Sequence, residues 1–330
     1  LQMQSRKTSA DLWHQKPYYS LDAWCKNTYG RKLYKAALDI GCTCPNRDGT
    51  LDTRGCIFCS AGGSGDFAAS RQLSVTDQLN QAKALLSSKW TPEPGKPSLI
   101  AYFQAYTNTY GDPDRLLSCY EEALSSPEVA GISIATRPDC LSDIILEGLD
   151  RLRLLYPDRF IWIELGLQSI HDHTAARIRR GYPTSVFYDA AAKLHARRLP
   201  FIVHLILGLP GETRLDLLES IRAVNQVHPF GVKLQLLHIL KGTDLALLYE
   251  AGKLPVLTQE EYLDLLTSCI AALSPDICLH RVTGDGPRKL LIAPQWSLSK
   301  RNVLNGLHAL MKQRNLRQGD NYEPGTSYTL

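Results

Sequence analysis

The sequence contains no apolar run of the roughly 18 residues that a membrane-spanning helix needs. Its first residues include Arg6, Lys7 and Asp11 where a secretory signal peptide would have an apolar core. No internal repeat or low-complexity segment stands out along the 330 residues. These absences argue against a membrane, secreted or repeat protein. They predict a cytoplasmic globular chain with one large core or two modest ones.

The sequence also lacks the even number of cysteines that a fully disulfide-bonded scaffold has. It contains nine cysteines, so at least one thiol stays unpaired. In a reducing cytoplasm, clustered cysteines bind metal or carry out redox chemistry more often than they form disulfides. The cysteines are therefore expected to mark a metal or redox site.

Charge of one sign is not in large excess, because 37 basic and 33 acidic residues give a formal net charge of +4. The distribution is uneven, however. Residues 1–35 carry seven basic and two acidic side chains, and residues 281–330 carry eight and three. The segment between them has a net charge of −6. Two basic ends on an acidic body favour an anionic partner at one face. Chance clustering on solvated helices is the alternative.

Short apolar runs alternate with amphipathic stretches from residue 36 almost to residue 290. The amphipathic stretches begin after typical helix-capping residues, such as Ser142, Thr213 and Thr258. Strands that alternate with helices in this way form βαβ units and a parallel sheet. The predicted strands are 36–40, 99–103, 131–135, 160–165, 201–207, 232–237 and 277–282.

We therefore expect an α/β fold, a partial (β/α)6 barrel of the TIM type. The barrel is predicted over residues 36–290, with a basic N-terminal extension at 1–35 and a basic C-terminal helix and tail at 291–330. Catalytic groups of such barrels lie where the strands end. Polar or glycine-rich stretches follow the predicted strands, as this rule requires, at 41–44, 104–109, 136–139, 164–169, 208–212 and 283–286.

The first of these stretches opens a cysteine-rich loop. Four of the nine cysteines fall in the segment from Cys42 to Cys59. The last two of the four, Cys56 and Cys59, form a CxxC pair. A zinc site is one interpretation, although only one residue separates Cys42 from Cys44, whereas zinc knuckles favour two to four. A redox CxxC pair should open a helix. The glycine-rich stretch 61–65 that follows Cys59 argues against that alternative.

The whole pattern resembles the radical S-adenosylmethionine (SAM) enzymes. Their final CxxC has an aromatic residue before its second cysteine, a place that Phe58 occupies here. Eleven residues separate Cys44 from Cys56, a longer gap than the common CxxxCxxC, as in the branch related to the Elongator acetyltransferase subunit. The likeness is to an uncharacterised bacterial group of that branch. It covers nearly the whole chain, including 43–50, 65–68, 106–111, 133–140, 164–169, 204–213, 237–243, 281–286 and 291–296.

The resemblance implies that Cys44, Cys56 and Cys59 bind three irons of a 4Fe-4S cluster. The fourth iron then stays open for the amino and carboxylate groups of S-adenosyl-L-methionine. Reductive cleavage of this cofactor yields a 5′-deoxyadenosyl radical that abstracts hydrogen from a substrate, so the cofactor supplies the difficult chemistry. Cys42 is expected to be a bystander. A zinc-stabilised binding module is the non-enzymatic alternative.

The resemblance also suggests which residues contact S-adenosylmethionine. The family places a Gly-Gly-Glu stretch after its second strand; this chain has no glutamate there, and neutral oxygens of Gln104, Thr107 and Asn108 are the substitutes. Glu164 is the candidate for the ribose hydroxyls, with an ion pair to Arg137 as the alternative use of its charge. The other candidate contacts are Arg137 itself, Gln168 near the ribose, Leu209 over the adenine and Phe58 beside the last cysteine.

The substrate is less well specified by the sequence. The Elongator-related branch modifies wobble uridine in tRNA, and this chain is expected to lack the acetyltransferase domain of that branch. The basic ends and a basic turn at 177–180 are consistent with phosphate contacts. We therefore expect tRNA as the substrate and flavodoxin or ferredoxin as the electron donor, with no membrane association. A radical step on a small metabolite or peptide is the alternative. His204 and His238 are further candidates for contact with the substrate.

Overall fold

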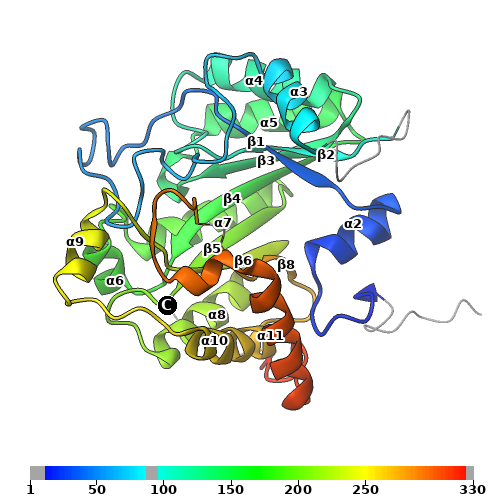
Figure 1. Cartoon of the computed structure of the whole chain (residues 1–330). Helices are drawn as coiled ribbons and strands as arrows, with labels where there is room; N and C mark the ends of the chain where they lie inside the picture. The colour runs from blue at the N-terminus through cyan, green and yellow to red at the C-terminus, as the bar shows by residue number, and fades with distance from the viewer. Residues whose placement is uncertain (1–11, 87–95, 285, 325–330) are drawn as a thin grey trace, which may run out of the picture.

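The computed structural model describes residues 12–86, 96–284 and 286–324. Its centre is a sheet of seven parallel strands in the order β1-β2-β3-β4-β5-β6-β8, which curls into a partial barrel (Figure 1). The predicted fold class is confirmed, and the seven strands lie at the seven predicted places, one more than the six of the expected (β/α)6 barrel. The strands are β1 (Tyr34–Leu38), β2 (Leu99–Phe103), β3 (Val129–Thr136), β4 (Phe160–Gln168), β5 (Phe201–Leu207), β6 (Gly231–Leu236) and β8 (Cys278–Arg281). A short antiparallel pair, β7 (Ile239–Leu240) and β9 (Leu291–Ala293), lies outside this sheet.

Helices cover the outer face of the sheet, and several begin at the predicted caps. The side chains of Ser142, Thr213 and Thr258 each accept a hydrogen bond from a backbone N–H of the first helical turn. The helices that connect the strands are α3 (Val75–Leu86), α4 (Pro113–Ser125), α5 (Asp143–Leu155), α6 (Asp172–Arg177), α7 (Thr184–Ala196), α8 (Arg214–Val227), α9 (Asp244–Glu250) and α10 (Gln259–Ala272). Their apolar faces and the outer face of the sheet share one continuous core. No helix in the described part of the chain is long and apolar enough to cross a membrane.

The N-terminal extension closes the bottom of the barrel, where the strands begin. Its helix α2 (Leu21–Tyr29) places Trp24 edge-on to Trp162, Phe160 and Phe230, with ring centroids 5.0 to 5.6 Å apart. The surrounding apolar cluster includes residues from the starts of four strands. The cavity of the barrel is therefore sealed at this end by aromatic packing. Residues 1–11 of the extension, with Arg6 and Lys7, lie outside the described residues.

Residues 12–20 lie against the C-terminal helix α11 (Lys300–Gln313) and the segment that follows it. Helix α11 packs on α10 and brings His308 within 3.2 Å of the Tyr18 hydroxyl. The Gln318 side chain accepts a hydrogen bond from the backbone N–H of Tyr19, and the backbone N–H of Gln318 donates to the carbonyl of Pro17. The guanidinium of Arg317 stacks on the ring of Trp13. The segments 12–35 and 300–324 thus form one joined surface.

Replacing Trp24 by alanine tests whether the N-terminal helix is part of the core. Because Trp24 packs against three aromatic rings, we expect the W24A variant to lose about 3 to 5 kcal/mol of unfolding free energy, measured by urea denaturation. Thr28→Ala changes an exposed residue of the same helix and is expected to have little effect. Equal stability of the two variants would show that α2 is a dispensable appendage.

Candidate functional site

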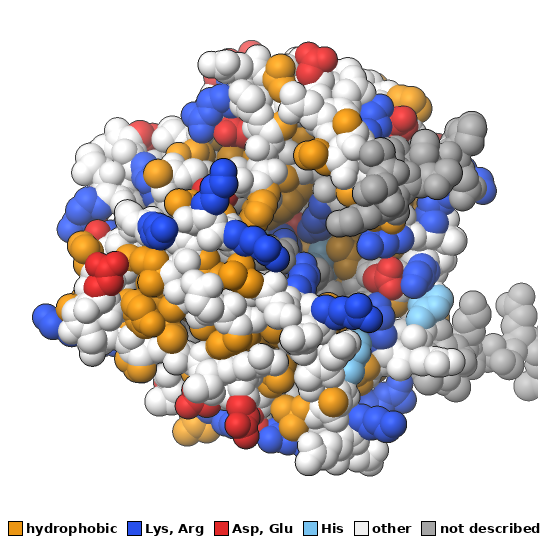
Figure 2. Space-filling view, viewed as in Figure 1, with side chains coloured by type: hydrophobic (Ala, Val, Ile, Leu, Met, Phe, Trp, Pro, Cys, Tyr) orange, Lys and Arg blue, Asp and Glu red, His pale blue; other side chains and the backbone are white. Residues whose placement is uncertain are grey.

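Two adjoining cavities open at the carboxyl ends of the strands, as the fold predicts. The smaller has a volume of about 170 Å3 and is lined by the cysteine loop and the ends of β3 and β4. The larger has a volume of about 350 Å3 and lies toward β1, β6 and β8. Both are lined by Phe58, Ser64, Tyr102, Gln104, Gln235 and Arg281, so they form one continuous site. Figure 2 shows the molecule hollowed near the middle of this face, with Lys and Arg side chains around the hollow.

The three predicted cluster ligands lie together on the wall of the smaller cavity. Cys44, Cys56 and Cys59 all line it, whereas Cys42 is buried in the main apolar core. Burial raises the pKa of the Cys56 thiol to about 12 and also raises the pKa of Cys59. Such thiols favour the protonated form unless a cation takes up their charge. The donor set of three sulfurs beside a cavity fits a metal cluster with one open position.

The three sulfurs are not gathered around one point in this structure. Within the described residues, the side chains whose ligand atoms all lie within 4.8 Å of one another are His171, Asp216 and Glu219, not the three cysteines. Thiolates on one tetrahedral zinc ion would lie closer together than that limit, because zinc–sulfur bonds are about 2.3 Å long. The three sulfurs would therefore have to move together to hold a single zinc ion.

The cysteine loop is held by hydrogen bonds rather than by regular secondary structure. The Arg47 guanidinium donates to the carbonyls of Cys59 and Ser60, at 2.8 and 2.7 Å. The Asn46 amide donates to the carbonyls of Arg179 and Arg180, which belong to the turn after α6. The backbone N–H of Ile57 bonds to the carbonyl of Ile178 in the same turn. The loop is thus fixed to the segment that follows β4.

Six of the eight residues predicted to contact S-adenosylmethionine line the smaller cavity. They are Phe58, Gln104, Thr107, Arg137, Glu164 and Gln168. Asn108 does not line it, because its amide turns inward and donates to the carbonyls of Phe103 and Ala135, both at 3.0 Å. Leu209 is also away from it, buried in an apolar cluster with Ile57 and Leu237. Asn108 therefore fastens β2 to β3, and Leu209 supports the loop from beneath.

Glu164 is fully buried at the centre of the inner face and joins several strands. Its carboxylate accepts hydrogen bonds from Ser133 at 2.6 Å and His204 at 2.7 Å. It also forms ion pairs with Lys35 at 3.2 Å and with Lys233. Burial alone would raise the pKa of Glu164, but the two lysines hold it well below its usual range. Glu164 is therefore an ionised carboxylate surrounded by donors.

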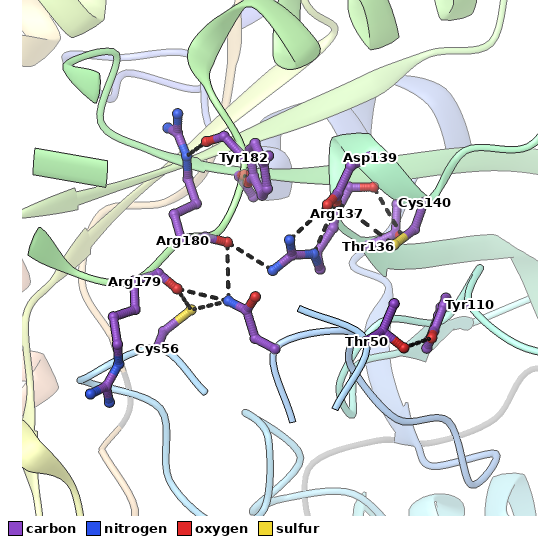
Figure 3. Close-up of polar contacts among 12 residues, drawn as sticks. Thr50, Cys56, Tyr110, Thr136, Arg137, Asp139, Cys140, Arg179, Arg180 and Tyr182 are labelled. Carbon is purple, nitrogen blue, oxygen red and sulfur yellow. Dashed lines mark hydrogen bonds and ion pairs between the residues drawn. The ribbon is translucent and has the colours of Figure 1, made fainter. Parts of the chain in front are cut away.

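Arg137, the alternative partner considered for Glu164, pairs with Asp139 instead. Its guanidinium forms a two-point ion pair with Asp139, at 2.9 and 2.7 Å, and donates to the carbonyl of Arg180 (Figure 3). It also stacks on the ring of Tyr182, which Arg180 covers as well. Arg137 therefore brings positive charge to the cysteine side of the cavity while Glu164 stays with the lysines.

The basic turn at 177–180 does not present a phosphate-binding surface. Arg180 is buried, and its guanidinium donates to the carbonyls of Leu167 and Ser169. Arg179 pairs with Asp244, and Arg177 donates to the carbonyl of Pro210. A basic run in the sequence does not show that its guanidinium groups donate hydrogen bonds to backbone carbonyls in the folded protein. The expectation of phosphate contacts at this turn is therefore not supported.

Several residues of the site were not anticipated from the sequence. Tyr102, Lys233, Gln235 and Arg281 lie on the inner face of the sheet or at its end. A lysine inside an otherwise apolar strand was the available signal, because burying an unpaired charge is costly. His204 and His238, which were anticipated, line the smaller and the larger cavity respectively.

Comparison with known proteins identifies the family. The Radical SAM superfamily model matches residues 44–224, and the Radical_SAM C-terminal domain model matches residues 229–313. The chain therefore belongs to the radical SAM superfamily, whose enzymes use a 4Fe-4S cluster and S-adenosylmethionine.

Individual relatives refine this placement. The uncharacterized protein YtqA of Bacillus subtilis is 40% identical over 92% of each chain. Elongator complex protein 3 of Bos taurus is 25% identical over 49% of this chain and 29% of its own length. The solved structure of Elp3 from the archaeon Methanocaldococcus infernus shares the fold, with a TM-score of 0.63 at 16% identity, over 87% of this chain and 64% of that chain. The resemblance to the Elongator branch is thus confirmed.

The pKa of His204 gives a test of the buried network. Burial and Lys233 lower this pKa to about 4, whereas an unfolded histidine titrates near 6.5. Between these two values the unfolded chain binds the extra proton, so stability falls as the pH falls. The loss amounts to about 3 kcal/mol from His204 alone. Urea unfolding of His204→Gln should show a shallower fall between pH 6.5 and 4 than the parent protein.

The matched control is His173→Gln, which changes an exposed histidine. It is expected to keep the parent slope. A His204→Gln variant with the same pH dependence as the parent would show that His204 titrates normally in the folded protein.

Proposed function

We propose that this radical SAM enzyme modifies tRNA, on the side chain of a wobble uridine. In this proposal Cys44, Cys56 and Cys59 hold the cluster at the smaller cavity, and the substrate enters the larger one. The observation that carries the choice of tRNA is the joining of the two basic ends into a single surface. Their contacts are the hydrogen bonds of Gln318 and the pair of Tyr18 with His308.

When bound, the cluster and S-adenosylmethionine supply a 5′-deoxyadenosyl radical. The residues of this chain hold the cofactor and shield the site. Arg137 lines the smaller cavity and can meet the carboxylate of the cofactor there. Gln104 and Thr107 line the same cavity and offer neutral oxygens to its ammonium group. The aromatic seal around Trp24 closes the other end of the barrel to water. A water-excluding site protects a reactive intermediate from side reactions.

The larger cavity suits a nucleotide turned out of an RNA loop. Enzymes that act on a base move it into a pocket where hydrogen bonds and stacking read it. The walls here combine the rings of Phe58 and Tyr102 with the amides of Gln104 and Gln235. Phe67, half-exposed at the rim, adds an aromatic surface for stacking. The cavity therefore offers both kinds of contact to a uridine.

Exposed basic side chains on the joined surface are the candidates for phosphate contacts. Arg301 and Lys312 are exposed on α11, and Lys32 is exposed just before β1. Arg314 contributes less, because it is paired with Asp264. A small one-electron carrier, flavodoxin or ferredoxin, is the proposed electron donor. The cytoplasm is the proposed location.

The ligand assignment predicts the iron content of cysteine variants after anaerobic reconstitution. Cys44→Ala, Cys56→Ala and Cys59→Ala should each lose most of the bound iron and sulfide, because each removes one of three cluster ligands. Cys42→Ala, in the apolar core, should keep its cluster. If Cys42→Ala loses iron while Cys44→Ala retains it, the first ligand has been assigned to the wrong cysteine. A colourless protein that holds one zinc ion would defeat the whole assignment.

The tRNA proposal predicts salt-dependent binding that depends on the joined surface. Affinity for bulk tRNA should fall steeply between about 50 and 200 mM salt, because each neutralised phosphate releases counterions. The Arg301→Glu/Lys312→Glu variant should weaken binding and reduce the slope of log affinity against log salt by about one for each lost contact. Arg151→Glu is the control, since it lies exposed on α5 at the opposite end of the molecule (Figure 1).

Mass spectrometry of tRNA nucleosides from cells lacking the gene identifies the chemistry. A uridine derivative should be lost and its precursor should accumulate, and the gene encoding the parent protein should restore the profile. An unchanged nucleoside profile, with tRNA binding that is indifferent to salt, would favour the alternative of a small metabolite or peptide substrate.

A further inference from the structure

The Asn46 amide occupies a special position in the cysteine loop. Asn46 is almost completely buried, and its nitrogen Nδ2 lies 3.6 Å from the Sγ atom of Cys56. The same nitrogen lies 2.7 Å from the carbonyl of Arg179 and 3.0 Å from that of Arg180. An amide nitrogen has two hydrogens. These two hydrogens face three acceptors, two carbonyls and the sulfur, so at least one hydrogen is shared between two of them.

The surroundings of Cys56 create a need for this donor. The Cys56 thiol donates its own proton to the carbonyl of Arg179, at 3.5 Å (Figure 3). A cysteine that ligates iron has lost this proton. Its sulfur would then face a carbonyl oxygen with no hydrogen between them. An Asn46 amide hydrogen that reaches the Cys56 sulfur offsets the repulsion between that sulfur and the carbonyl oxygen.

The turn that carries the two carbonyls is rigid, so the amide is held in place. The Arg180 guanidinium is anchored on the carbonyls of Leu167 and Ser169 and on the hydroxyl of Thr184, at 2.6 to 2.9 Å. The Arg180 carbonyl also accepts a hydrogen bond from Arg137, at 2.9 Å. Both acceptors of the Asn46 amide therefore belong to a segment fixed to the end of β4.

Gly181 makes room for the amide. Its backbone has φ of +84°, a conformation that favours glycine. A Cβ atom at this position would come within 2.5 Å of the Asn46 oxygen Oδ1. Any larger residue would push the amide out of its position. The turn is therefore shaped around Asn46 by both its carbonyls and its missing side chain.

We propose that Asn46 is a positioning residue whose N–H donates to the Cys56 sulfur of the bound cluster and raises the reduction potential of that cluster. Hydrogen bonds to ligating sulfurs stabilise the added negative charge of a reduced iron–sulfur centre. Asn46 thereby makes the cluster easier to reduce by the electron donor. The inference rests on the proposed ligand role of Cys56 and is independent of the identity of the substrate.

The test is an anaerobic redox titration of the reconstituted protein in the absence of tRNA. Electron paramagnetic resonance measures the reduced cluster at each potential. The Asn46→Ala variant should keep its iron content but show a reduced-to-oxidised ratio lower by about threefold to tenfold at a fixed potential, tenfold being 59 mV for one electron. Asn225→Ala is the control, because Asn225 also joins two backbone segments through its amide but lies between α8 and α10. An unchanged ratio in a loaded Asn46→Ala variant would overturn the proposal.

A second pair of variants decides the matter if Asn46→Ala takes up no iron. Gly181→Ala keeps the amide but displaces it, and Gly252→Ala introduces the same strain at a positive φ with open space around it. Gly181→Ala should be harder to reduce than Gly252→Ala, and equal potentials would overturn the proposal. Failure of the ligand assignment is recognised separately, because a Cys56→Ala variant would then retain its full iron content.

Discussion

A single buried carboxylate holds the inner face of this barrel together. The carboxylate of Glu164 on β4 accepts hydrogen bonds from side chains of four other strands. They are Lys35 of β1, Ser133 of β3, His204 of β5 and Lys233 of β6. A curled sheet with polar groups on its concave face would otherwise bury several charges without partners, which is costly. The carboxylate satisfies them together and keeps the strands in register around an open cavity. The positions of Tyr102 on β2, of Gln104 directly after β2 and of Gln235 on β6 depend on this arrangement.

The cysteine loop depends on a different principle, because it has almost no regular secondary structure. Its hydrogen bonds reach across to the turn after α6 through Asn46 and the backbone of Ile57, while Arg47 ties the loop to its own carbonyls at Cys59 and Ser60. This turn is itself anchored by Arg180 on the end of β4. The cysteines are thus tied to the same strand that carries Glu164. The wall that carries the cysteines and the wall that carries Glu164 are therefore joined to each other through β4.

The sequence predicted the strands, and the grouping of Cys44, Cys56 and Cys59 at one cavity, better than the contacts between side chains. Apolar runs and capping residues such as Ser142 and Thr213 are local signals, and they located the elements within a few residues. The fates of Asn108 and Arg180 are not local, because each depends on which carbonyls lie within reach after folding. A polar residue after a strand can line the cavity or bind the neighbouring backbone. Sequence spacing alone does not distinguish these two uses.

For the basic segments near the two ends, the sequence likewise did not show which charges stay exposed and which are paired. Their charge excess was visible in the sequence, but only folding brings residues 12–35 and 300–324 together. Some of that charge is spent inside the fold, since Lys35 is paired with Glu164 and Arg314 with Asp264. Among the basic side chains that stay exposed, Arg301 and Lys312 lie on α11. A polyanion that contacts this helix would meet charges held at fixed spacing by the packing of α11 on α10, so the fold converts a compositional bias into a defined surface.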